Sequence, residues 1–352
     1  MELRNSIQKL NSLLSKRQSM KRKSTNAQLL DKESKKIYTN FKNFLDKNLI
    51  EKHFAVGVSG GPDSLALVYF SKIYSLEKKF CFRGIIIDHG IRADSDLEAK
   101  KVKKILLKHD IKTTILKIKI SNSKNLHLEA RKKRYDKIIN FCYKKKIKNI
   151  LLGHHLDDQI ENFYIRLSRG SGLAGLSPIK KNLKMKKINF LRPLLDINKN
   201  QLVKIAKKYF NFYVNDPSNH DDKYLRSRLR KLRISLKNEG FDDKKFAKTL
   251  DNLNKANVAL QFYSDLAIKR FFVINNNHTV ISKKLFLEPY EIIFRSISIF
   301  LTKDKDYPPR SKGIDYLIDE LSHENKKKVT LGGYIFKNGL KSVIVNKEVN
   351  KR

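Results

Sequence analysis

The sequence predicts an α/β fold, with a doubly wound parallel sheet in its N-terminal part and a smaller α+β C-terminal domain. Strand-like and helix-like segments alternate over the first two-thirds of the chain, as they do in βαβ units. Three unusual polar stretches, SGGPDS, DHG and HHLDD, follow predicted strands, and parallel sheets bind ligands at the carboxyl ends of their strands. After about Lys237 the alternation stops.

The alternation begins with a helix over residues 37–49, in which apolar residues recur at helical spacing. The strand HFAVGVS follows, then a helix from Ser64, and then the strand FRGIIID, which ends at Asp88. The pattern Ser95-x-x-Glu98 is typical of a capping box, so a third helix is expected to open there.

The next strand is expected to be an edge strand or a half-exposed one, because apolar residues at positions 116, 118 and 120 alternate with lysines. A long basic helix over residues 128–145 comes next, and the strand NILLGH then ends at His154. The helix that follows has apolar residues at i, i+3, i+4 and i+7, starting from Ile160. These elements complete the predicted βαβ series.

The C-terminal part predicts three helices, over residues 241–271, 289–301 and 311–321, and then a hairpin. The hairpin sequence is VTLGGYIFKNGLKSVIV, and Asn338-Gly339 is expected to form its type I′ turn. We therefore predict three segments: a basic N-terminal arm (1–34), an α/β domain (35–237) and a C-terminal domain (238–352).

The composition favours a polyanionic partner. Lys and Arg number 76 against 35 Asp and Glu, so the formal net charge is +41. Nucleic acid is the first candidate and an anionic membrane surface the second, although an AT-biased genome would also raise the lysine content. Cys81 and Cys142 stand outside any CxxC motif, which argues against a disulfide framework and a four-thiolate zinc site. A reducing cytoplasm fits, and no apolar run approaches the roughly 18 residues of a membrane span.

The stretch from Val56 to Leu67, VGVSGGPDSLAL, has the pattern of an anion-binding turn between a strand and a helix. Its glycine pair permits close approach and positive φ, and two serines add hydroxyl donors. Where a Walker loop would place Lys and Ser/Thr, this loop places Asp63 and Ser64. SGG alone would equally suit a plain turn, whereas the six residues SGGPDS are more specific.

SGGPDS resembles the signature of the ATP-pyrophosphatase (PP-loop) superfamily, which has an adenine nucleotide alpha hydrolase-like fold and releases pyrophosphate on adenylating a substrate carbonyl. Further stretches resemble the tRNA(Ile)-lysidine synthase family: IIIDHGIR, EARKKRY, GHHLDDQIEN, RLSRGSGLAGL, RPLL and NDPSN. TLGG resembles the C-terminal domain of that family. The resemblance covers roughly Ile37 to Val345, and several motifs in the right order are more specific than one.

The resemblance implies a two-step reaction in the cytoplasm. ATP, with Mg²⁺, would adenylate the 2-carbonyl oxygen of the wobble cytidine in the CAU-anticodon tRNA(Ile). Free L-lysine would then displace AMP through its ε-amine, and the lysidine formed would change decoding from AUG to AUA. The residues implied in ATP binding are Ser59, Gly60, Gly61, Pro62, Asp63, Ser64, Asp88 and His89.

The lysine step requires carboxylates. An ammonium has a pKa near about 10.4, so the site must bind it and then accept a proton. The candidates are Asp63, Asp157, Asp158 and Glu161. Asp158 and Glu161 share a helix face at i, i+3 and are predicted to bind the amine, with Asp63 between lysine and Mg²⁺. One of the two adjacent aspartates is expected only to cap the helix. His154 and His155 are expected to form a hydrogen-bonded strand end or, since HHxDD could hold a hard divalent ion, to be metal ligands. Zinc is disfavoured there, because a third nitrogen or sulfur ligand is missing nearby.

The basic segments are the candidates for tRNA or phosphate contact. Residues 223–233 read KYLRSRLRKLR with no acid among them, so helical ion pairing cannot satisfy them. We predict contacts from Arg226 and Arg230, and by resemblance from Arg131 or Arg134, for which a solvated helix face is the alternative. Ser227 stands where the family pattern has Asn. The glycine-rich stretch after Arg169 is expected to form a mobile loop over the site.

Two rival functions follow from the same sequence. One is a tRNA-thiolating ATP-pyrophosphatase, but neither cysteine lies at the carboxyl end of a predicted strand. The other is a non-catalytic RNA-binding protein on the same fold, which the intact SGGPDS and the DD-x-x-E set disfavour. The oligomeric state is open, with a homodimer as one candidate.

Overall fold

The computed structural model describes residues 30–88, 90, 94–118, 126–215, 225–303, 309–323 and 327–348. Contacts among these residues separate two compact units. Unit 1 comprises the described residues up to Ser171 together with Pro178–Ala247. Unit 2 comprises Gly172–Ser177 and the described residues from Lys248 onward. The boundaries predicted at residues 34/35 and 237/238 stay predictions.

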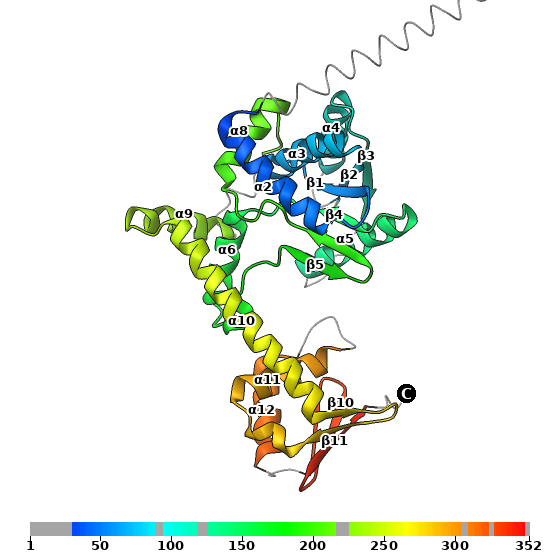
Figure 1. Ribbon diagram of the computed structural model, residues 1–352, viewed down its shortest axis with the longest axis vertical. Helices are drawn as coiled ribbons and strands as arrows, with labels where there is room; N and C mark the ends of the chain where they lie inside the picture. Colours follow the sequence, from blue (N-terminus) through cyan, green and yellow to red (C-terminus); the bar gives the residue numbers. More distant parts are fainter. Residues whose placement is uncertain are drawn as a thin grey trace, which may run out of the picture. The chain divides into compact units, whose positions relative to one another are not determined.

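Unit 1 contains the predicted parallel sheet, with its described strands in the order β3-β2-β1-β4-β6-β5 (Figure 1). The pairings from β3 through β6 are parallel, and β5 joins β6 antiparallel. The strands are β1 His53–Val58, β2 Cys81–Asp88, β3 Thr113–Lys117, β4 Asn149–Leu151, β5 Asn182–Met185 and β6 Ile188–Leu191. β3 is an edge strand, which was one of the two predicted alternatives. The strand order reverses beside β1, and ligands bind at such switch points.

Helices cover both faces of this sheet, so the doubly wound prediction is confirmed. The helices of unit 1 are α2 Lys32–Asn48, α3 Pro62–Lys78, α4 Ser95–Lys108, α5 Leu126–Lys144, α6 Leu156–Leu167, α8 Lys199–Phe210 and α9 Leu225–Asn238. Successive residues of β1 point to opposite faces. Phe54, Val56 and Val58 join a buried cluster with α2, α3, α4 and α8, whereas Ala55 joins a cluster with α5.

The elements around the switch point differ from the sequence prediction in two details. The capping box at Ser95 is wrong, because Asp94 is the N-cap residue of α4. The Ser95 hydroxyl instead donates to Asp88 Oδ1 over 2.8 Å. β4 ends at Leu151 rather than at His154, so a short non-helical segment lies between the strand and α6. That segment lines the candidate site.

Unit 2 packs helices against a five-stranded antiparallel sheet of order β7-β8-β11-β10-β9. Its strands are β7 Phe272–Ile274, β8 Thr279–Ser282, β9 Lys328–Leu331, β10 Tyr334–Asn338 and β11 Ser342–Lys347. Its helices are α7 Leu173–Leu176, η2 Lys283–Leu287, α11 Tyr290–Thr302 and α12 Ser311–Ser322, and α10 Asp243–Phe271 begins in unit 1 and continues into unit 2. The core contains Ile297, Leu301, Leu317 and Phe336.

The type I′ turn predicted at Asn338-Gly339 is wrong. Asn338 belongs to β10 and pairs with Val343 of β11, while its side-chain amide donates to Glu320 O over 3.3 Å. The two-residue turn with positive φ at both positions is Gly332-Gly333, at +62° and +75°. Glycine adopts these angles without a Cβ clash, so Gly332-Gly333 forms the turn between β9 and β10.

In the described part of the chain, the helices that are long enough to cross a membrane carry too many charged and polar residues to do so.

Candidate active site

The SGGPDS loop joins the end of β1 to the start of α3, at the carboxyl edge of the sheet. Gly60 has φ +87°, and a Cβ there would lie 2.7 Å from Val102 Cγ2 and 2.9 Å from Val214 Cγ2. Only glycine fits that position. Gly61 is the N-cap residue and Pro62 is the first residue of α3, where a missing N–H is harmless.

Two serine hydroxyls hold the loop. Ser64 Oγ accepts the backbone N–H groups of Ser59 and Gly60, each over 3.2 Å, and donates to Gly61 O over 2.9 Å. Ser59 Oγ accepts the N–H of Gly61 over 3.3 Å. The hydroxyls therefore fix the turn, while the first-turn N–H groups of α3 lack intrahelical acceptors and favour an anion.

The segment between β4 and α6 lies directly against this loop because of Gly153. A Cβ on Gly153 would lie 3.2 Å from the backbone carbon and oxygen of Asp63 and 3.2 Å from the nitrogen of Ser64. The absence of a side chain lets the start of α3 approach the exit of β4. Asp63 on α3 and the first turn of α6 are thereby brought together.

His155 connects the two segments. It is the N-cap residue of α6 and only 3% exposed. Its Nε2 lies 3.4 Å from Asp63 Oδ2 and 3.5 Å from Asp158 Oδ2. Asp158 Oδ2 also accepts the backbone N–H of His155 over 3.0 Å. Two of the predicted lysine-binding carboxylates therefore face one imidazole nitrogen, whereas the sequence suggested His155 only as a strand-end residue or a metal ligand.

The two adjacent histidines are in opposite electrostatic environments. Burial alone would lower the pKa of His155, but its hydrogen bond to Asp63 and the charges of Asp158, Asp63 and Asp157 raise it overall. Burial lowers the pKa of His154, and the charges of Arg192 and Arg134 lower it further, against an opposing effect of Asp158. An acidic side and a basic side of the site meet at these two residues.

The other two candidate carboxylates are bound by arginines of α9. Arg230 Nε donates to Glu161 Oε1 over 2.5 Å, and Arg230 Nη2 to Glu161 Oε2 over 3.4 Å. Arg233 pairs with Asp157 over 2.7 Å and with Asp243 of α10 over 2.7 Å. The basic run in α9 therefore has acidic partners, but they lie on other helices and were invisible in the local sequence.

The basic side of the site is formed by arginines of α5, α9 and the segment after β6. The guanidinium carbons of Arg131 and Arg134 lie 5.5 and 5.6 Å from the ring centroid of Tyr135. Burial lowers the pKa of Arg134, and the charges of Arg131 and Arg226 add to that effect. Arg192 is 3% exposed and donates from Nη1 to Lys180 O over 2.8 Å. The sequence pointed to Arg192 only through RPLL, one of the stretches that resemble the family.

Asp88 lies at the end of β2 and organises the turn that follows. It is 5% exposed, and its Oδ1 accepts the Gly90 N–H over 3.0 Å as well as the Ser95 hydroxyl. His89, the other residue predicted in this turn, lies outside the described residues. Their predicted contact with ATP stays a prediction.

Magnesium would fit this site only together with a nucleotide. Across the described ranges, no three His, Cys, Asp or Glu residues are grouped to hold a metal ion. Asp63 Oδ1 is buried and has no hydrogen-bond partner among the residues that the structure describes. Mg²⁺ is commonly bound by one or two carboxylates plus substrate phosphates, so one carboxylate beside an anion-binding loop is compatible with it.

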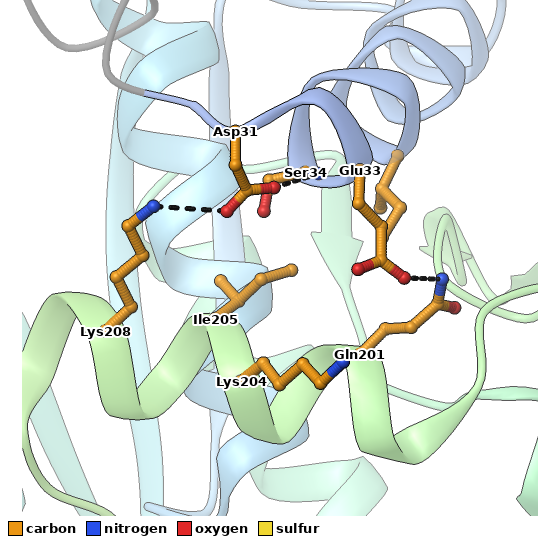
Figure 2. Close-up of a pocket in the computed structure, with 8 residues that line it drawn as sticks. Asp31, Glu33, Ser34, Gln201, Lys204, Ile205 and Lys208 are labelled. Atoms are coloured by element: carbon orange, nitrogen blue, oxygen red, sulfur yellow. Dashed lines mark hydrogen bonds and ion pairs between the residues drawn. The ribbon is translucent and has the colours of Figure 1, made fainter.

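A hollow between α2 and α8 offers no comparable chemistry, because its polar groups pair with one another (Figure 2). Asp31 accepts the N–H of Ser34 over 2.8 Å and the ammonium of Lys208 over 3.1 Å. Glu33 accepts the amide of Gln201 over 2.7 Å. These contacts join two helices away from the strand ends, so the SGGPDS loop is the candidate site.

Comparisons relate this chain to known proteins. A family model described as a PP-loop domain matches residues 33–235. The chain is 31% identical over 320 residues to a tRNA(Ile)-lysidine synthase from Orientia tsutsugamushi (strain Boryong), covering 84% of this chain and 70% of that protein. It is 30% identical over 305 residues to a tRNA(Ile)-lysidine synthase from Wolbachia pipientis wMel, covering 84% and 71%.

Among solved structures, a U34-tRNA thiolase from Methanococcus maripaludis matches with a TM-score of 0.53 and 19% identity. The match covers 63% of this chain and 78% of the thiolase. At that identity the likeness shows a shared fold and nothing of the chemistry.

Proposed function

This chain belongs to the PP-loop family and, within it, to the tRNA(Ile)-lysidine synthases, and we propose that it ligates lysine to the wobble cytidine of a CAU-anticodon tRNA(Ile). It is an ATP-using ligase that modifies tRNA. One observation supports a lysine step most strongly. Asp63 and Asp158 face one imidazole nitrogen beside the SGGPDS loop, with no Lys or Arg partner in the described part of the chain.

The phosphates of ATP are proposed to lie on the SGGPDS loop, residues 59–64, at the N-terminus of α3. Backbone N–H groups and the helix dipole favour the negative charge that accumulates on the leaving pyrophosphate. Mg²⁺, when bound at Asp63, would neutralise part of that charge. Asp88 and His89 are proposed to border the nucleoside part.

The amine is proposed to bind between Asp63 and Asp158. These carboxylates would hold the ammonium and accept the proton that it must lose before its nitrogen attacks. The new C2–N bond forms as the bond from C2 to the AMP oxygen breaks, so AMP leaves. Glu161 is proposed to border this position, but Arg230 already holds it, so it contributes less than predicted from the sequence.

The arginines of the basic side are proposed to contact phosphate groups. Arg131, Arg134 and Arg226 carry like charges close together, and a polyanion would relieve their mutual repulsion. Arg230 was predicted in the same role, but its pair with Glu161 favours a structural one. The C-terminal unit is proposed to read the tRNA body, and a homodimer stays a candidate assembly.

Thiolation is not favoured by any contact in the described residues. Burial raises the pKa of Cys142 to about 12, which suppresses the thiolate that sulfur transfer requires. Cys81 is exposed at the amino end of β2, the wrong edge of the sheet. Two cysteines are also too few for the four thiolates that usually hold an iron–sulfur cluster.

A single assay tests the proposal. The protein is incubated with ATP, Mg²⁺, labelled lysine and a tRNA(Ile) transcript that carries a CAU anticodon. We expect label in the tRNA and release of pyrophosphate. Folded protein that gives neither would contradict the proposed function, and a transcript with a different anticodon serves as the control.

A further inference from the structure

The carboxylates of Asp63 and Asp158 come from separate segments, and His155 is the side chain that contacts both. Asp63 lies in the first turn of α3 and Asp158 in the first turn of α6. Each presents its Oδ2 to His155 Nε2, at 3.4 and 3.5 Å. The position between the acids therefore depends on where the imidazole ring is held.

The imidazole ring of His155 is held in place by its burial and by the hydrogen bonds of the His155 backbone. His155 is 3% exposed, its N–H donates to Asp158 Oδ2, and its carbonyl accepts the N–H of Gln159 over 3.3 Å. Nδ1 is buried and has no hydrogen-bond partner among the described residues. The polar contacts of the ring are thus made through Nε2, toward the two carboxylates.

The contacts made by Nε2 are longer than a strong charge-assisted hydrogen bond, which spans roughly 2.7–2.9 Å. Nε2 also has only a single hydrogen for the two carboxylate oxygens. Asp63 Oδ1 lacks a partner among the described residues altogether. An ammonium, with three N–H donors, could complete the hydrogen bonding of both acids.

The neighbouring acids, Glu161 and Asp157, have a different kind of partner. Glu161 and Asp157 are bound by guanidinium groups at 2.5 and 2.7 Å, close contacts that a small ligand would have to break. Asp63 and Asp158 instead face His155 Nε2 at 3.4 and 3.5 Å, and Asp158 Oδ2 also accepts the backbone N–H of His155. Asp63 Oδ1 is left without a partner among the described residues, while His155 fixes the positions of both carboxylates.

We infer that His155 is a positioning residue, which sets the separation of the Asp63 and Asp158 carboxylates so that both can bind the ε-ammonium of the incoming lysine. The inference rests on the proposed function. It names a residue that acts through the two carboxylates and does not itself touch the reacting atoms. Its loss should therefore affect the use of lysine more than the adenylation of tRNA.

Two amide substitutions at His155 distinguish a positioning role of its side chain from a packing role. In His155→Gln the amide nitrogen reaches approximately the place of Nε2, whereas in His155→Asn it reaches only the place of Nδ1, which has no described partner. Both are neutral and polar. We expect His155→Gln to keep kcat/KM for lysine within about fivefold, and His155→Asn to lose about 100-fold, because small misplacements of a reacting site cost rate steeply.

Pyrophosphate release in a single turnover without lysine is measured on the same samples. We expect it to fall by much less than lysine transfer does, by about tenfold at most in His155→Asn, because Asp63 would also hold Mg²⁺ during adenylation. Equal losses of lysine transfer in both variants, or a parallel loss of pyrophosphate release, would overturn the inference in favour of packing. Wild-type protein without lysine transfer would instead overturn the proposed function, which is read from that sample alone.

Wild-type protein gives a second test in case His155→Asn does not fold. The side-chain ¹⁵N resonances of His155 are followed by NMR, with His155→Gln used for assignment. Saturating L-lysine should shift them, whereas L-norleucine, which lacks the ε-ammonium, should not. Unchanged resonances at saturating lysine would overturn the inference.

Discussion

Asp157 and Asp158 are adjacent in the sequence, yet their carboxylates have different partners. Asp157 is bound by Arg233 and also accepts the N–H of Lys199 over 3.4 Å. Asp158 accepts the N–H of His155 and faces the imidazole beside Asp63. At the scale of residues, one aspartate holds helices together and the other borders the proposed amine position.

Asp158→Asn should lower lysine transfer by about 100-fold and leave ATP affinity within about twofold. The amide keeps its shape but loses the charge that binds an ammonium and the capacity to accept its proton. Labelled-lysine incorporation and ATP titration measure the two effects. Asp157→Asn is the matched control and should cost about 1 kcal/mol of stability with little loss of transfer. Equal transfer in Asp158→Asn and wild type would remove Asp158 from this role.

Gly60→Ala should destabilise the protein by about 2 kcal/mol or more. Its φ of +87° is strained for alanine, and the added Cβ would meet two valine side chains. Gly61→Ala is the control, because φ there is −68° and the nearest atom to the new Cβ is Ser59 Oγ at 3.5 Å. Urea unfolding of both variants measures the difference. Equal stabilities would contradict the strain at Gly60.

At the scale of elements, α9 illustrates why a basic run cannot be interpreted from its own sequence. Arg226 is exposed on this helix, whereas Arg230 and Arg233 reach acids on α6 and α10. Nothing in the local sequence KYLRSRLRKLR distinguishes the exposed arginine from the two that are paired. Only the packing of α9 against α6 divides them.

Arg226→Ala should reduce the slope of log affinity for tRNA against log salt concentration by about 1, without lowering the unfolding midpoint. One fewer phosphate contact releases about one fewer counterion. Arg230→Ala should instead destabilise the protein by about 3 kcal/mol, because it leaves the buried Glu161 carboxylate unpaired. Binding measured at several salt concentrations, together with unfolding curves, distinguishes the two. An unchanged salt slope in Arg226→Ala would place that side chain away from tRNA phosphate.

Asp31, the N-cap residue of α2, should make the free energy of unfolding depend on pH in the acid range. The Ser34 N–H, followed by Lys208, lowers the pKa of Asp31 to about 2. A depressed pKa means that this contribution is present above the ordinary value of 3.8 and is lost as pH falls toward 2. Asp31→Asn should therefore differ from wild type near pH 5 and converge with it near pH 2, as followed by urea unfolding.

Lys208→Met distinguishes the two causes of the lowered pKa of Asp31, the N-cap hydrogen bond and the ion pair. It removes the ion pair and keeps the N-cap hydrogen bond, which is the larger cause, so it should retain most of the acid dependence. If Lys208→Met lost the whole dependence, the ion pair rather than the N-cap would be responsible.

The alternating strands and helices of unit 1 were predictable because their periodicity is local. The hairpin of β5 and β6 was not anticipated, since NLKM and INFL are short and separated by lysines. The C-terminal meander has two turns where one was predicted. Gly332-Gly333 joins β9 to β10, and residues 339–341 join β10 to β11 in a connection longer than the predicted two-residue turn.

The candidate site was predictable in part for the same reason. Motifs placed the SGGPDS loop and the DD-x-x-E set at neighbouring strand ends. The link through His155, the pairing of Glu161 with Arg230 and the burial of Arg192 depend on contacts between segments far apart in the chain. Such contacts leave no periodic signal in one sequence.

At the scale of the whole molecule, the two units have separate cores, so each should unfold in its own calorimetric transition. ATP with Mg²⁺ at about 100 times its Kd should stabilise only the transition of unit 1, by about 2.7 kcal/mol. Leu301→Ala is the control, because Leu301 is fully buried in unit 2 and its loss should lower only the other transition. A single transition shifted by both changes would contradict separate units.

Gly153 has a consequence for any map of mutational tolerance. Its φ is not positive, and it has no side chain that could bind a substrate, yet a Cβ there would press on the backbone of Asp63 and Ser64. In a saturation-mutagenesis screen scored by enzyme activity, position 153 should appear as intolerant as the acids it brings together. Such a map would make Gly153 look like a catalytic residue. Its role is instead to leave room for the backbone of Asp63 and Ser64.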